Sequence, residues 1–173
     1  MIRPHEAAPN YDDPLGLLAA CHRRIESQCA LLHKLVLHLQ AQGNDARAQE
    51  AAVGIVRYFD TAGRYHHEDE ERDLFPTLTA HDPALTPVLR DLAADHAHME
   101  SVWRRLRSAL AQVDTGGPAL DTALVEEFTA LYRAHIEREE REIFPRARQL
   151  LGPAEMAALA QGMAQRRGIK LDS

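Results

Sequence analysis

A segment rich in histidine and glutamate occurs twice in this chain. Residues 66–76 read HHEDEERDLFP, and residues 135–145 read HIEREEREIFP, with the two copies in exact register. Each copy holds a histidine and a glutamate four residues apart, His66 with Glu70 and His135 with Glu139. Four residues make about one helical turn, so each pair shares one helix face and can point at one metal ion.

A second, weaker repeat alternates with the first. Residues 21–27 read CHRRIES and resemble residues 95–101, DHAHMES, which aligns His22 with His96. The order along the chain is therefore His, His-x3-Glu, His, His-x3-Glu, as in a duplicated helical hairpin. The candidate metal ligands are His22, His66, Glu70, His96, His135 and Glu139.

Composition favours one all-helical domain over residues 1–173. Strand-forming residues are sparse, whereas Ala, Leu, Arg, Glu and Gln are abundant. The formal charge of −6 comes from interspersed acidic and basic residues, which argues against a nucleic-acid partner. A chain of 173 residues can bury a substantial core.

Neither a membrane nor an oxidising compartment is indicated. No apolar run approaches the roughly 20 residues that cross a bilayer, and the N-terminus lacks the apolar centre of a signal peptide, so we expect a cytoplasmic protein. Cys21 and Cys29 are eight residues apart on one predicted helix. This places them roughly 12 Å apart, too far for a mutual disulfide, and we expect reduced thiols in the core.

The chain divides into four long helices and a short one. After a loose arm over residues 1–11, we expect helices over about 14–42, 45–75, 84 or 87 to 113, 120–150 and 153–166. We expect the second helix to end near Pro76, a crossover at 77–87, and a disturbance of the fourth helix at Pro145. The predicted fold class is all-α, an up-down-up-down four-helix bundle over about 14–150 with an additional short C-terminal helix.

The heights of the four histidines agree with that topology. His22 and His66 lie almost equally far along the chain from the first short turn, at Gly43 and Asn44. His96 and His135 lie equally far from the centre of the second short turn, at residues 114–118. Antiparallel hairpins would therefore bring all four histidines to nearly the same level of the bundle.

Four histidines and two glutamates buried at one level would be costly to the core without a metal ion. Buried carboxylates must be paired or coordinated, and mixed imidazole and carboxylate donors suit iron, manganese or zinc. Six protein ligands are too many for one tetrahedral zinc ion. They suit two ions bridged by carboxylates and an oxygen species.

The doubled motif resembles the hemerythrin-like HHE cation-binding domain over roughly residues 14–150. The resemblance implies a non-haem centre of two iron ions inside the bundle, with the six candidate residues as its ligands. It further implies that Glu70 and Glu139 bridge the ions together with an oxo, hydroxo or water bridge. A small diatomic ligand, O2 or NO, is the implied partner.

Two positions depart from the oxygen-carrying hemerythrins. In the pattern of those proteins, a second histidine stands one turn before the ligand that corresponds to His96. This chain has Leu92 at that position. They often place Asp five residues after the last histidine, where this chain has Glu140. A lost histidine leaves a coordination position open or water-filled, which puts reversible oxygen carriage in doubt. Members with four His and two Glu resemble sensors of oxygen, nitric oxide or iron, and the di-iron proteins of iron–sulfur cluster repair. The repair proteins usually carry an added N-terminal cysteine-bearing domain, which is not found in this sequence.

Three functions follow from these residues. The first is a di-iron protein that senses, binds or buffers O2, NO or iron, and we favour such a binding protein over an enzyme. The second is a di-iron enzyme that acts on peroxide or nitric oxide, or in iron–sulfur cluster repair. The third is a metal-free helical interaction protein, which leaves the register of the histidines unexplained. The C-terminal helix and the N-terminal arm are candidates for a homodimer interface.

Other residues near the motif have their own expectations. His67 points about 100° away from His66 and is expected on the surface, as are His81 and His98. His33 is roughly 16 Å from His22 along the helix and is expected in the core or a pocket. Glu26 and Glu100 are candidates for further metal ligands or for hydrogen-bond partners of the histidines. Tyr132 is expected either to donate a hydrogen bond at the site or to pack in the core. The larger group expected on the outer face is Glu68, Glu71, Glu137 and Glu140.

Overall fold

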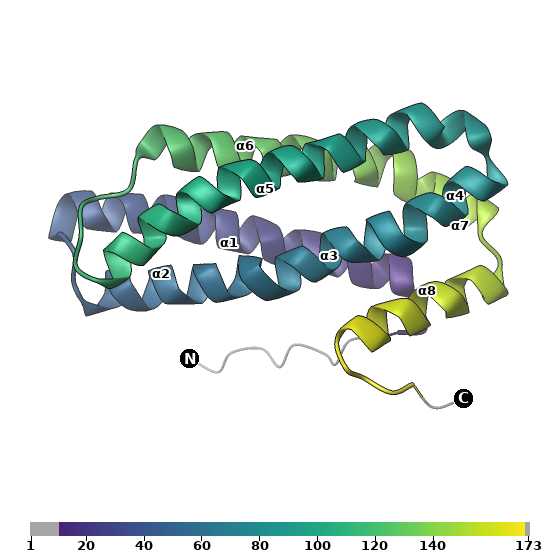
Figure 1. Cartoon of the computed structure of the whole chain (residues 1–173), viewed down its shortest axis with the longest axis horizontal. Helices are drawn as coiled ribbons and strands as arrows, with labels where there is room; N and C mark the ends of the chain where they lie inside the picture. Colours follow the sequence, from purple (N-terminus) through teal and green to yellow (C-terminus); the bar gives the residue numbers. More distant parts are fainter. Residues whose placement is uncertain (1–10, 172–173) are drawn as a thin grey trace.

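The computed structural model describes residues 11–171, and every regular element in that part of the chain is a helix. Four long helical columns run side by side with a shorter helix packed at one end (Figure 1). The predicted all-α bundle with an extra C-terminal helix is therefore confirmed. The predicted N-terminal arm lies almost entirely outside the described residues.

The columns are built from these elements. The first is α1 (Pro14–Gln42); the second is α2 (Ala46–Tyr58), η1 (Phe59–Gly63), α3 (Arg64–Asp69), η2 (Glu70–Leu74) and α4 (Phe75–His81). The short 3-10 helix η3 (Pro83–Leu85) leads to the third column, α5 (Thr86–Asp114). The fourth is α6 (Thr122–Arg138), η4 (Glu139–Ile143) and α7 (Phe144–Leu150), and α8 (Pro153–Arg166) follows.

Side-chain caps fix where the first hairpin begins and turns. The Asp13 carboxylate accepts a hydrogen bond from the Gly16 N–H at 2.9 Å, and α1 ends at Gln42, just before Gly43, whose φ of 77° favours glycine. Asp45 accepts from the Ala48 N–H at 3.0 Å and caps α2. The observed bounds of α1 agree with the helix predicted over residues 14–42.

The second column continues past Pro76, contrary to the sequence prediction. Residues 70–74 form a π-helical turn in which the Phe75 N–H donates to the Glu70 carbonyl, five residues back. Pro76 then falls in the first turn of α4, where its missing N–H costs little. The predicted crossover over 77–87 is accordingly mostly helical, up to His81 and again in η3.

Two apolar clusters lie above and below one polar level of the bundle. The upper apolar cluster extends from that level to the two short turns and includes Ile25, Phe59 and Met99. The lower apolar cluster lies toward the opposite end, includes Leu18 and Leu92, and contains side chains of α8. Between them the helices carry the buried histidines and glutamates of the predicted site.

Helix α8 is fixed to the second column by ion pairs. Arg166 and Arg167 both contact the fully buried Asp69 carboxylate at 2.7 Å, and Arg166 also pairs with Asp73. Leu159 and Met163 of α8 join the lower apolar cluster. Among the described residues, none of the helices combines the length and the apolar character that crossing a bilayer requires.

Candidate metal centre

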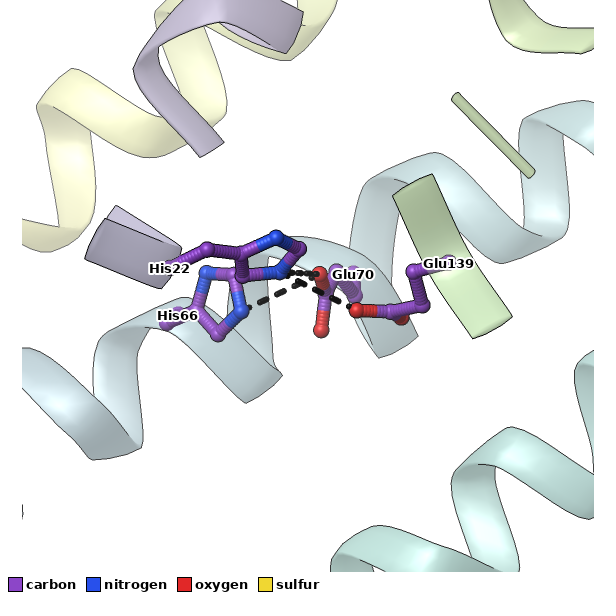
Figure 2. Close-up of side chains that lie close together, drawn as sticks. All are labelled: His22, His66, Glu70 and Glu139. Carbon is purple, nitrogen blue, oxygen red and sulfur yellow. Dashed lines mark ion pairs between the residues drawn. The ribbon is translucent and has the colours of Figure 1, made fainter. Parts of the chain in front are cut away.

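All six residues predicted as metal ligands converge at the polar level of the bundle. Each side chain is at most 3% exposed, and together they form two groups of four. The first group, shown in Figure 2, contains the two histidines of the first hairpin, and the second contains those of the second hairpin. Both groups include Glu70 and Glu139.

The two carboxylates each present one oxygen to each group. Glu70 places Oε1 3.3 Å from His66 Nε2 and Oε2 3.3 Å from His96 Nε2. Glu139 places Oε2 3.2 Å from His22 Nε2 and Oε1 3.3 Å from His135 Nε2. This is the arrangement of carboxylates that bridge two ions.

The spacing of the donor atoms fits ions between them. The Nε2 atoms of His96 and His135 face one another at 2.9 Å. Two ligand atoms bound at right angles, each about 2.1 Å from a common metal ion, lie about 3.0 Å apart. The donor atoms of each group all fall within 4.8 Å of one another. Geometry and donor type thus fit two metal ions.

A repeated backbone irregularity accompanies the two glutamates. The Phe144 N–H donates to the Glu139 carbonyl in η4, as the Phe75 N–H donates to the Glu70 carbonyl in η2. In both copies a proline follows the phenylalanine. The π turn therefore belongs to the duplicated motif, and π turns inside α-helices occur often at functional sites.

Outer carboxylates orient three of the four histidines. His22 Nδ1 lies 2.9 Å from Glu140 Oε1, and His96 Nδ1 lies 2.7 Å from Glu71 Oε1. His135 Nδ1 makes a longer contact, 3.5 Å, with Asp95. An Nδ1–H that donates to a carboxylate leaves the Nε2 lone pair free for a metal ion.

The repeated phenylalanine covers the same two rings. Phe144 stacks on His22 with centroids 5.1 Å apart, and Phe75 stacks on His96 at 6.0 Å. The column that carries Glu139 thus also contacts His22 of α1, and the column that carries Glu70 contacts His96 of α5. In each case the contact is made by one carboxylate and one aromatic ring.

The outer carboxylates differ from those that sequence reasoning considered. Glu26 and Glu100 are exposed and belong to neither group, so they are not the partners of the histidines. Glu71 and Glu140, expected on the outer face, are about half exposed, yet each reaches inward to an imidazole. The sequence did contain a hint of this role, because a second glutamate follows the ligand glutamate directly in both copies of the motif.

Without metal, the centre holds polar atoms that the protein leaves unsatisfied. Among the described residues, both carboxylate oxygens of Glu70 and of Glu139 are buried without a hydrogen-bond partner, and so are His22 Nε2 and His66 Nδ1. Burying such groups costs free energy unless an ion or a hydrogen bond compensates. The unsatisfied oxygens are those that face the imidazole nitrogens, as ligands of a cation require.

The two glutamates differ in electrostatic state. Burial, together with the nearby negative charge of Glu139, raises the pKa of Glu70 well above its usual value. Burial alone would also raise the pKa of Glu139, but the close imidazoles of His135 and His22 lower it. Burial lowers the pKa of His66 well below its usual value, which favours the neutral imidazole that binds metal.

The prediction that His67 lies on the surface is wrong. Its ring stacks on His96 with a centroid distance of 3.9 Å and on Tyr132 at 5.7 Å, and its Nε2 is buried. His67 belongs to neither group of four. Tyr132 is a buried core residue whose ring also packs on Phe59 and Phe128, as one of its two expected roles required.

His81 and His98 are exposed, as the sequence predicted. His33 was expected in the core or a pocket, but its side chain is 40% exposed. Its Nε2 lies 3.1 Å from the Thr129 hydroxyl, within hydrogen-bond distance and away from the centre. Leu92 occupies a fully buried position in the lower apolar cluster, one turn before His96.

Comparison with known proteins agrees with the doubled motif. Residues 13–147 match the family described as "Hemerythrin HHE cation binding domain". A protein of Haemophilus influenzae described as uncharacterized is 28% identical over 171 residues, which is 98% of each chain. The matched range includes all six residues of the centre.

Proposed function

Since the chain belongs to the hemerythrin HHE cation-binding domain family, we propose that it binds two non-haem iron ions and uses them to sense, bind or buffer O2, NO or iron. The supporting observation is that Glu70 and Glu139 each present one oxygen to both groups of histidines. Bound iron would supply a reversible change of oxidation state and coordination positions for a small ligand.

Each part of the site has a defined task in this proposal. His22 and His66 would hold one ion, His96 and His135 the other, and the two carboxylates would bridge them. Glu140 and Glu71 orient the imidazoles of His22 and His96. The apolar clusters on both sides limit water around the centre.

Metal analysis and the visible spectrum of protein purified in air test this proposal. We expect about two irons per chain and, for an oxo-bridged ferric pair, charge-transfer bands in the near ultraviolet. Binding of a single zinc ion, with no second metal even when iron is supplied without oxygen, would contradict a di-iron centre.

The position of Leu92 favours sensing or redox chemistry over reversible carriage of oxygen. Since Leu92 is an apolar side chain on the turn before His96, each group has only two histidines. Stopped-flow mixing of the diferrous protein with O2 would distinguish the roles. Direct conversion to the diferric state is expected, whereas O2 uptake reversed by removing the gas would restore the carrier function.

A further inference from the structure

A groove of about 710 Å³ lies between the second column and α5 and leads to one side of the centre. His67, His96 and Tyr132 line it on the inside, and Arg64 and Trp103 line it toward the surface. A groove of this size has room for a small anion or a diatomic molecule.

The groove reaches only one of the two groups of ligands. Of the six residues of the centre, His96 alone is among its lining residues. All four histidines are at most 3% exposed, so the groove, and not the exposure of the rings, distinguishes the two sides. The side with His96 and His135 is therefore the one that a molecule in the groove meets first.

His67 gives that side a polar ring at a position where the second repeat has an apolar residue. Its ring lies parallel to His96, with an angle of 14° between the planes, and its Nε2 is buried with no hydrogen-bond partner in the described part of the chain. At the matching position of the second repeat stands Ile136, which packs in the upper apolar cluster. A buried, unpaired ring nitrogen costs stability, and a ligand that hydrogen-bonds to it would remove that cost.

We propose that exogenous ligands enter through this groove and bind on the His96/His135 side of the centre, where His67 hydrogen-bonds to them. The inference rests on the proposed di-iron function. The expected ligands are small anions and diatomic molecules that accept a hydrogen bond from an imidazole N–H.

Azide binding to the diferric protein tests the role of His67. The His67→Leu variant should bind azide about 3- to 10-fold more weakly, the loss expected for one hydrogen bond. His67→Gln, which retains an N–H donor, should recover part of this affinity, and His98→Leu, at an exposed position on α5, should match the wild type. Equal azide affinity of His67→Leu and the wild type would overturn the proposal.

The route is tested separately from the contact. Ala97 is exposed on α5 and lines the groove, whereas Ala130 is exposed on α6 outside it. Ala97→Trp should slow azide association severalfold, while Ala130→Trp should leave the rate unchanged. Equal association rates in the two variants would show that ligands enter elsewhere.

Iron content separates the failure of this inference from that of the proposed function. A wild-type protein that binds no iron pair refutes the function itself. Two irons per chain with a normal spectrum, but azide affinity and association unaffected by the groove variants, refute only the route and the role of His67.

Discussion

The two halves of the bundle, residues 14–81 and 86–150, hold the same metal-binding side chains in different surroundings. Both contribute two histidines, one glutamate with a π turn, and an outer glutamate. At corresponding positions, however, the first half has His67 and Asp69 where the second has Ile136 and Arg138. The first half also contains the additional π-helical segment η1, whereas α6 is continuous.

The two halves have the same metal-binding residues but differ at the positions beside them. A ligand must stay within about 2 Å of its ion, so the donor positions match in both halves. The positions beside them carry no such constraint. In the first half one of them faces the groove and another binds α8, and so the halves can differ in ligand access and in stability.

The strongest test of the equivalence of the halves is to remove a bridging carboxylate. Since Glu70 belongs to both groups, Glu70→Gln should abolish binding of both irons, and Glu139→Gln should do the same. Iron content per chain measures the effect. A variant that keeps one iron firmly would show that the carboxylates are not shared.

The same substitution has an opposite effect on the metal-free protein. A carboxyl group whose folded pKa is raised above the unfolded value of 4.5 costs stability as pH rises beyond that value. Metal-free Glu70→Gln should therefore unfold at a higher temperature than the metal-free wild type at pH 7, with a smaller difference near pH 5. Thermal unfolding at the two pH values checks this sign.

Removal of one histidine should affect one half at a time. His66→Ala and His135→Ala should each reduce iron content toward one per chain and lower the thermal stability that bound metal provides. His98→Ala, at an exposed position, is the control. Complete loss of iron from both single variants would mean that the two ions bind only as a pair.

Asp69 and Arg138 should differ most in their effect on folding. Asp69→Ala leaves the partly buried Arg166 and Arg167 without their common carboxylate, and breaking a buried pair costs about 3–5 kcal/mol. Arg138 makes a peripheral contact with Asp91 at 3.3 Å, so Arg138→Ala should cost about 0–1 kcal/mol. Urea unfolding of the metal-free variants measures both, and equal costs would remove this difference between the halves.

The smallest expected effect concerns the outer glutamates. Glu71→Ala and Glu140→Ala should each weaken iron binding about 10- to 100-fold, as is typical when the partner of a ligating histidine is removed. Competition with a chelator measures this affinity. Glu137→Ala, at an exposed position with no contact to a histidine of the centre, should change nothing, and a similar loss there would point to general surface charge.

Much of this architecture could be predicted because its signals are local. Asp13 before Pro14 marks the start of the first helix and Gly43 marks its end, while the repeated motif indicates which residues share a level. Pro76 was misinterpreted because the expected helix end assumes α-helical hydrogen bonding. The π turn moves the Phe75 bond one residue further back, and the proline is then tolerated.

The errors at the site arose from neighbouring helices. His67 lies on the face of its helix that packs against α5, where its ring stacks on His96. Its counterpart Ile136 was the available hint, because an apolar residue at the matching position suggests burial. The contacts of Asp69 with Arg166 and Arg167 join residues almost a hundred positions apart, and no local pattern reports them.

His22 and His96 are each held by residues of the opposite half, and this has a consequence for assembly. Glu140 and Phe144 of the second half hold His22 of the first, while Glu71 and Phe75 of the first hold His96 of the second. Neither half alone contains a supported ligand set. Residues 82–85 join the halves and so supply a high effective concentration of one for the other. If the chain were cut there, iron affinity should become dependent on protein concentration, and iron itself should drive the two fragments to associate.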